Sequence, residues 1–152
     1  MLHFLIFTDM GKVRNILENK SKVIFSVSPD TLVYNALELM FEKNVSALLV
    51  MENDYPVGIF TERDYARDIA LKGKSSRETK MNETMTKNLI TIDPDFSIED
   101  AMRLMTEKFI RHLPVMHENK LVGLISIGDL VKYLIEEQKF IINKLEDYIG
   151  HT

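Results

Sequence analysis

Two short stretches of the chain share one order of residue types. Residues 58–64 read GIFTERD and residues 123–129 read GLISIGD, so in both a Gly, two apolar residues and a hydroxyl residue precede an Asp. A hydroxyl at a helix start lies beside backbone N–H groups that have no partner within the helix, which suits a phosphate oxygen. A carboxylate one turn later can accept hydrogen bonds from both hydroxyls of a ribose. The two stretches therefore predict two binding sites for a polar ligand.

Helix capping is the alternative interpretation of the same residues. Thr61 with Asp64, and Ser126 with Asp129, have the spacing of a capping box, in which hydroxyl and acid satisfy backbone N–H groups at a helix start. Asp is shorter than the Glu or Gln that usually closes such a box, and the pattern recurs at a matched position. We therefore expect all four residues to contact a ligand, with capping as the competing explanation.

The two stretches belong to a longer internal repeat. A shift of 65 residues aligns 29–64 with 94–129 without a gap, and 13 of the 36 aligned positions are identical. A common helical pattern would explain similar residue types, but it would not place Pro-Asp, Gly and Asp at the same offsets. The repeat indicates an internal duplication, and its length predicts a body of two lobes rather than a solenoid.

Each copy has the pattern of a β-α-β-β-α unit, which predicts an α/β fold. Apolar residues spaced i, i+3, i+4 and i+7 follow Ser-Pro-Asp at 28–30 and Asp-Pro-Asp at 93–95, whose residue types suit a helix start. A second helix is expected to begin at Thr61 and at Ser126. The predicted strands are 23–27, 47–51 and 57–60 in the first copy, and 89–92, 112–116 and 122–125 in the second.

Composition limits the class of protein. The chain has 152 residues, of which 45% are hydrophobic and 28% are charged, as in ordinary globular domains. It has no Cys, which excludes disulfides and thiolate metal sites, and its net charge of −4 argues against a nucleic-acid or anionic-membrane partner. We expect no metal site, because His112 and His117 should point apart and no acidic cluster accompanies them.

The first residues, MLHFLIF, are apolar but lack the features of a signal peptide. No basic segment precedes them, and Thr8 and Asp9 interrupt a run far shorter than the roughly 20 residues that span a bilayer. We therefore expect a cytoplasmic protein. The first residues are either a buried N-terminal strand or arm, or an upstream extension with Met10 as the true start.

The last helix carries more apolar surface than one small lobe requires. Spacings of three and four continue from Ile127 to Ile149, and Gly150 is suited to end the helix. The stripe packs either on its own domain or on a second copy. We favour a homodimer contact, because the spacing persists to the end of the chain.

The repeat resembles the CBS domain, and the tandem resembles a CBS pair, or Bateman module. The residues that carry the resemblance are SPDTLVYNALELM and ALLVMENDYPVGIFTERD in the first copy, and DPDFSIEDAMRLM and RHLPVMHENKLVGLISIGD in the second. It implies two small three-stranded sheets with flanking helices, related by a pseudo-twofold axis, with a cleft between the lobes. The expected parts are an extension at 1–12, a first CBS domain at 13–72, a linker at 73–80, a second CBS domain at 81–137 and a C-terminal helical tail at 138–152.

The resemblance also implies a ligand. Modules of this kind bind adenine-containing molecules such as AMP, ADP, ATP, NAD or S-adenosylmethionine. A basic pair, here Arg111 and His112, often reaches phosphates of a nucleotide whose ribose is held by the Asp of the opposite copy, here Asp64. Arg63 is a further candidate for the same site. The Asp129 site lacks such a pair, so we expect it to be weaker or to take a less charged ligand.

The predicted function is that of a stand-alone regulatory sensor without catalytic residues. It would bind AMP, ADP, ATP or NAD in the cleft and transmit occupancy by a conformational change. The competing hypothesis is a ligand-free dimerisation or scaffold module, which would gain support if Asp64 and Asp129 were both engaged in local capping bonds. No enzyme is expected, since the sequence has no nucleophile with a general base and no phosphate loop.

Overall fold

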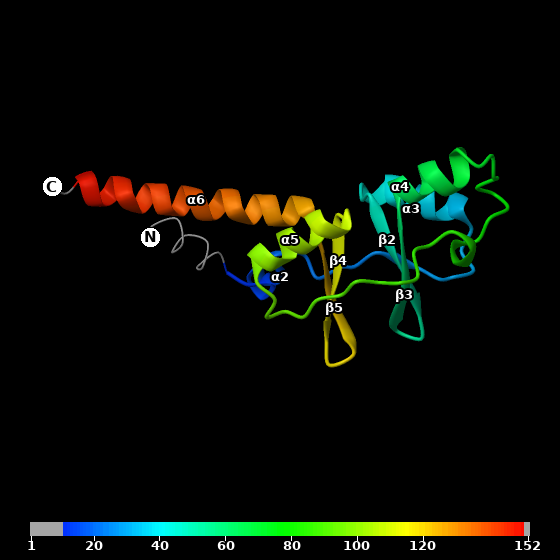
Figure 1. Cartoon of the computed structure of the whole chain (residues 1–152), viewed down its shortest axis with the longest axis horizontal. Coiled ribbons are helices and arrows are strands. Elements are labelled where there is room, and N and C mark those ends of the chain that lie inside the picture. The colour runs from blue at the N-terminus through cyan, green and yellow to red at the C-terminus, as the bar shows by residue number, and fades with distance from the viewer. Residues whose placement is uncertain (1–10, 151–152) are drawn as a thin grey trace. The chain divides into compact units, whose positions relative to one another are not determined.

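The computed structural model of the chain describes residues 11–150 (Figure 1). These residues divide into two compact units, named here by the Asp of their repeated stretch. The Asp64 unit consists of 23–91 with 116–122, and the Asp129 unit consists of 11–22, 92–115 and 123–150. Each contains strands and helices, so the predicted α/β class is confirmed. The N-terminal arm with Met10 lies outside the described residues.

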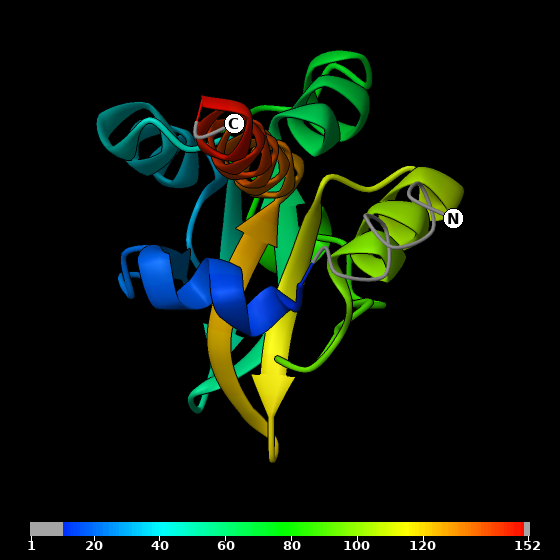
Figure 2. The ribbon, with the colours of Figure 1, turned by 90° about the vertical axis from the view of Figure 1, so that its left-hand side faces the viewer.

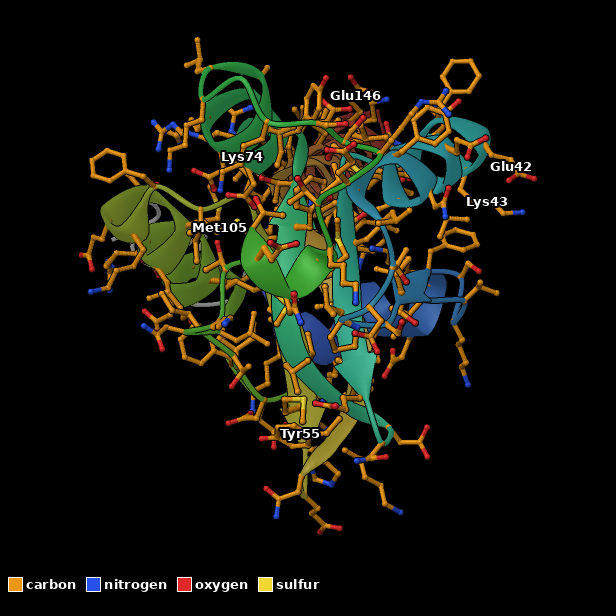
Figure 3. All side chains as sticks on the ribbon, turned by 90° about the vertical axis from the view of Figure 1, so that its right-hand side faces the viewer. Glu42, Lys43, Tyr55, Lys74, Met105 and Glu146 are labelled. Carbon is orange, nitrogen blue, oxygen red and sulfur yellow. The ribbon has the colours of Figure 1, made fainter. Side chains whose placement is uncertain are left out.

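The sheet of the Asp64 unit has three strands in the order β1-β2-β3, as predicted for the first copy. Strand β1 (Ser26–Val27) runs parallel to β2 (Ala47–Glu52), and β2 pairs antiparallel with β3 (Tyr55–Thr61). Tyr55 lies at the turn end of this hairpin (Figure 3). Strand β3 ends at Thr61, so the strand itself delivers the hydroxyl to the first repeated stretch.

Helix α3 (Val33–Lys43) supplies the core of this unit. Its apolar face packs with residues of β2 and β3 in one cluster, as the helical spacing predicted. Glu42 and Lys43 lie on the outer side of α3 (Figure 3). The buried members of the cluster from these three elements are Val33, Ala36, Met40, Leu48, Val50 and Phe60.

The helix that follows β3 is short and changes its pitch. Helix α4 (Glu62–Asp64) begins after Thr61 as predicted, but it continues as the π-helical segment η1 (Tyr65–Ala70). The backbone N–H of Leu71 donates to Ala66 O at 3.0 Å, which closes a wider turn than an α-helix has. Such π turns occur frequently at functional sites.

The second copy repeats this plan with one difference in its sheet. Strands β4 (His112–His117) and β5 (Lys120–Ser126) pair, but the third strand implied at 89–92 is reduced to a single bridge between Ile92 and Val115. Ile92 N donates to Pro114 O at 3.1 Å, so the backbone of Pro114 faces this edge. Proline has no N–H to donate in return, and the ladder therefore stops after one bridge.

Two helices complete the Asp129 unit. Helix α5 (Ile98–Lys108) buries Ile98, Ala101 and Met105, which are the positions that α3 buries, shifted by 65 residues. Helix α6 (Ile127–Gly150) follows β5 directly and continues for 24 residues, which confirms the predicted long last helix. Ser97 caps α5 by accepting a hydrogen bond from Asp100 N at 3.0 Å.

The two hairpins turn in the same way. The central residues of both turns have positive φ angles: 52° and 62° at Asn53 and Asp54, and 50° and 64° at Glu118 and Asn119. Two-residue turns of this kind match the right-handed twist of the strands that they join. The polar turns predicted between the strands are confirmed at both places.

The segment before each copy is hydrogen-bonded to the other copy. Helix α2 (Val13–Asn19) precedes the first copy but bonds to the second, with Val13 N donating to Phe96 O at 2.9 Å (Figure 2). The 3₁₀ turn η2 (Met81–Glu83) precedes the second copy but bonds to the first, with Met81 N donating to Thr31 O at 2.8 Å. Residues 13–22 therefore group with the second copy, and the boundaries expected for the two domains stay a prediction.

The stretch predicted as a linker, 73–80, is bonded into the Asp64 unit. Thr79 O and Ser76 O accept hydrogen bonds from Val33 N at 2.8 Å and Tyr34 N at 2.9 Å, so they satisfy donors at the start of α3. The guanidinium of Arg77 lies 4.0 Å from the centre of the Tyr34 ring. The basic residues of this stretch thus have structural contacts that composition did not indicate.

Candidate functional site

In the Asp64 unit, the repeated stretch forms a closed capping arrangement. Thr61 N and Thr61 Oγ1 both donate to Asp64 Oδ2, at 2.9 and 3.1 Å, and Asp64 N donates to Thr61 Oγ1 at 3.2 Å. Glu62 N donates to Ser46 O at 3.1 Å, which fixes the helix start against β2. Thr61 and Asp64 are thus held together at the end of β3, as predicted.

The Asp129 unit builds the same arrangement. Ser126 N donates to Asp129 Oδ2 at 2.8 Å, and Asp129 N donates to Ser126 Oγ at 3.1 Å. Ile127 N donates to Arg111 O at 2.9 Å, just as Glu62 N bonds to Ser46 65 residues earlier. The duplication therefore extends to individual hydrogen bonds.

Both carboxylates make local capping bonds, which is the observation that was expected to support the scaffold hypothesis. Every bond just described to Asp64 or Asp129 ends on the Oδ2 atom. A carboxylate offers about four acceptor positions on its two oxygens, so capping leaves acceptor capacity on each side chain. Capping and ligand binding are therefore compatible in this geometry, and the capping bonds orient the carboxylate.

Burial gives Asp64 an unusual electrostatic setting. Desolvation is the largest influence and raises the pKa of the Asp64 carboxyl above its ordinary value, while the hydrogen bonds from Thr61 lower it. Asp68 raises this pKa and Arg67 lowers it. Arg67 was missed from the sequence, although its spacing of three from Asp64 places it on the same helical face. A partly desolvated carboxylate of this kind gains from further hydrogen-bond donors.

Arg63, the other basic candidate of this stretch, lies on the exposed side of α4. The structure brings together Thr61 and Asp64 with Arg67 as the nearby cation that acts on the carboxyl. A contact of Arg63 with a ligand stays a prediction.

The structure places Arg111 and His112 in the Asp129 unit, at the start of β4. Burial is the main cause that lowers the pKa of His112, and the charges of Lys20 and Arg111 lower it further, whereas Asp129 raises it. These influences show that His112 shares an electrostatic environment with Asp129. The predicted partnership of Arg111 and His112 with Asp64 stays a prediction.

Lys20 is a second residue near the candidate sites that the sequence did not reveal. Its Nζ donates to Asp129 Oδ2 at 2.6 Å and to Leu124 O at 2.6 Å. Lys20 lies more than 100 positions before both partners, so no local spacing pointed to the contact. The only available signal was its place at the end of α2, whose packing on the second copy depends on tertiary structure.

Residues 11–150 lack two other features, a metal-binding cluster and a membrane-spanning helix. No group of three or more His, Cys, Asp or Glu side chains is placed to hold a metal ion there. No helix in the same range combines the length and the apolar composition needed to cross a membrane.

The repeat that shapes both units is a known one, since the sequence profile of the CBS domain matches residues 13–71 and 81–136. The chain belongs to the CBS-domain family. A CBS domain-containing protein from Arabidopsis thaliana, CBSX3, named as mitochondrial, is 41% identical over 125 residues, which are 79% of this chain and 61% of that protein. The chain therefore spans less than two thirds of this relative.

Solved structures agree with the CBS-pair architecture. A putative signal-transduction protein with CBS domains from Burkholderia ambifaria MC40-6 has a TM-score of 0.81 and 46% identity, over 84% of this chain and 96% of that one. The CBS domain pair of protein MJ0100, solved in complex with 5′-methylthioadenosine and S-adenosyl-L-methionine, has a TM-score of 0.72 over 83% of this chain and 97% of that one. At 23% identity, this similarity is a similarity of fold alone.

Proposed function

We propose that this CBS pair binds an adenine nucleotide, with AMP, ADP, ATP and NAD as the candidate ligands, and that binding regulates a partner protein. The observation that carries the proposal is the duplicated hydroxyl–carboxylate pair, in which capping bonds orient the carboxylate and leave it acceptor capacity. The fold of the MJ0100 pair, whose complex contains two adenosine compounds, supports this class of ligand.

The chemistry of the first stretch fits a ribose. The two hydroxyls of a ribose are adjacent donors that a carboxylate can accept together. Asp64 is partly desolvated, so donors that replace lost water would stabilise its charged form. Thr61 is held at hydrogen-bonding distance from the same carboxylate and is the candidate for an additional polar contact. Arg63, Arg111 and His112 are the candidates for phosphate.

The second part of the proposal is that ligand binding has a regulatory role. We assign no catalytic residues, so a ligand acts here only by favouring one conformation over another. A cytoplasmic location remains our expectation, although the Arabidopsis relative is named as mitochondrial.

Thermal unfolding in the presence of ligands tests the proposal. The purified protein is melted with AMP, ADP, ATP, NAD, S-adenosylmethionine or GTP, and in buffer. A ligand that binds only the folded chain, at about 100 times its dissociation constant, adds roughly 2.7 kcal/mol to the stability. We expect adenine ligands to raise the melting temperature and GTP to leave it unchanged.

Variants assign the shift to the proposed residues. Asp64→Asn keeps an oxygen for capping but removes the charge, and it should reduce the shift. Asp64→Asn combined with Asp129→Asn should abolish it. Asp54→Asn is the matched control, because Asp54 is an exposed turn residue of the same unit and Asn tolerates its positive φ. No shift with any adenine ligand would overturn the proposal.

A second candidate function is a dimerisation module that acts through α6. The side chains of Ile135, Ile142 and Leu145 are 48%, 52% and 57% exposed, although all are large and apolar. Val131, Ile135, Gln138, Ile142 and Leu145 alternate in steps of four and three, which is the spacing of a coiled-coil seam. Ile135 and Ile142 occupy one core position of this seam and Leu145 the other, a combination that favours two parallel helices, although Gln138 places a polar residue at the second position. The occupant that fits it is α6 of a second copy.

A further inference from the structure

Lys20 makes the two repeated stretches chemically different. Its ammonium bridges Asp129 Oδ2 and Leu124 O, each at 2.6 Å. The side chains of Lys20 and Asp129 are 34% and 24% exposed, so the pair is partly shielded from water. Ion pairs in such settings are screened less than those on the open surface. The carboxylate of Asp129 is thus already bound to a cation before any ligand arrives.

The Asp64 unit satisfies the matching groups without an ion pair to the carboxylate, although the charge of Arg67 acts on it. The carbonyl that corresponds to Leu124 O is Ile59 O, which accepts the backbone N–H of Thr86 at 2.9 Å. The ion pairs found among residues 11–150 do not include Asp64. The two motifs therefore differ because different segments precede the two copies: Lys20 follows α2, and Thr86 follows η2.

The length of helix α2 explains why Lys20 reaches the site. Helix α2 has seven residues and is followed by Lys20, whereas η2 has three and is followed three residues later by the bridge between Thr86 and Ile59. At Leu124 O, the Lys20 ammonium makes the bond that the backbone N–H of Thr86 makes at Ile59 O in the other copy. The same ammonium also reaches the carboxylate of Asp129.

We propose that Lys20 restricts the Ser126–Asp129 motif to ligands that carry a phosphate, which reverses the expectation from the sequence that this site takes a less charged ligand. The inference rests on the proposed function, because it assumes that Asp129 accepts a ribose. A ribose must share or displace the ammonium, and a neutral nucleoside brings nothing to compensate the cation. A nucleotide brings an anion that can take over the Lys20 ammonium while its ribose binds Asp129. The Asp64 motif has no such requirement.

Calorimetric titration with AMP and adenosine tests this in the Asp64→Asn background, in which only the Asp129 motif is intact. A hydrogen bond to a charged group is commonly worth a factor of about ten or more in affinity. We therefore expect AMP to bind at least about tenfold more tightly than adenosine. Lys20→Met should raise the affinity for adenosine by about tenfold and lower that for AMP. Lys22→Met, an exposed lysine two residues away, should change neither.

A ligand-free measurement checks the contact itself. The unfolding free energies of Lys20→Met, Asp129→Asn and the double variant form a double-mutant cycle. We expect a coupling between the two substitutions, whereas additive effects would mean that Lys20 does not hold Asp129.

The outcomes separate the two proposals. If AMP and adenosine bind the Asp64→Asn protein but Lys20→Met leaves their ratio unchanged, the role of Lys20 is overturned and the proposed function stands. If the parent protein binds AMP but Asp64→Asn binds neither compound, the Asp129 motif is no ligand site and the role of Lys20 falls. If the parent protein binds no adenine ligand, both proposals fail together.

Discussion

The carboxylates of Asp64 and Asp129 make matching bonds to their own helix starts but differ in their surroundings. Burial raises the pKa of Asp64, whereas Lys20 pairs directly with Asp129. Neither difference is visible in the repeated stretches, because both come from residues outside them. The two motifs therefore differ in chemistry although their capping bonds are alike.

His112 offers a test of the electrostatics around Asp129. Its pKa lies below the ordinary 6.5, chiefly because of burial, so the unfolded chain takes up a proton at a higher pH than the folded chain does. The stability due to neutral His112 is therefore present above pH 6.5 and is lost as the pH falls toward the folded pKa. We expect His112→Gln to lose less unfolding free energy than the parent when the pH falls below 6.5.

Denaturant unfolding of the parent and of His112→Gln at several pH values measures this effect. Equal pH dependence in the parent and His112→Gln would contradict the assignment.

At the scale of elements, the two copies end their first helix in the same left-handed conformation with different residues. Asn44 follows α3 with φ 54°, and Phe109 follows α5 with φ 55°. Asn tolerates this conformation, whereas a residue such as Phe pays roughly 1–2 kcal/mol for it. The Phe109 side chain is 80% exposed, so little burial would be lost on replacement.

We therefore expect Phe109→Asn to raise the unfolding free energy by about 1 kcal/mol. In a chain of this size the melting temperature should rise by about 3 °C. The reciprocal change, Asn44→Phe, should lower the stability by a similar amount, and differential scanning calorimetry measures both. A Phe109→Asn protein that melts no higher than the parent would show that the ring makes a contact that offsets the strain.

At the scale of the whole molecule, the exposed seam of α6 predicts association of two copies. Ile142→Lys would bury an unpaired charge in a dimer seam, a change that costs more than about 3 kcal/mol and weakens association more than about a hundredfold. Asn143→Lys adds the same charge next to the seam position. It should leave the two-chain mass of the associated protein in solution unchanged. Sedimentation equilibrium distinguishes one chain from two, and a monomeric parent would exclude the α6 dimer.

The sequence by itself determined the repeated parts of this protein. The helical spacing that ends in Met40 and Met105 specifies which helix faces are buried, and Gly58 with Asp64 and Gly123 with Asp129 mark the two strand-to-helix stretches. These features are local: side chains three or four positions apart share a helix face, and a hydroxyl one turn before an acid meets it. The α/β class, the polar turns and the two capped helix starts followed from such local rules.

Only the tertiary structure decided what the local rules do not reach. Helix α2 packs on the copy that it does not precede, which brings Lys20 to Asp129 across more than 100 residues. The backbone of Pro114 faces the edge where Ile92 approaches, which reduces the second sheet to two strands. Burial shifts the pKa of Asp64 and of His112. The Lys20 contact, the two-stranded sheet and the pKa shifts all depend on which distant segments become neighbours. Residue spacing along the chain does not predict these neighbours.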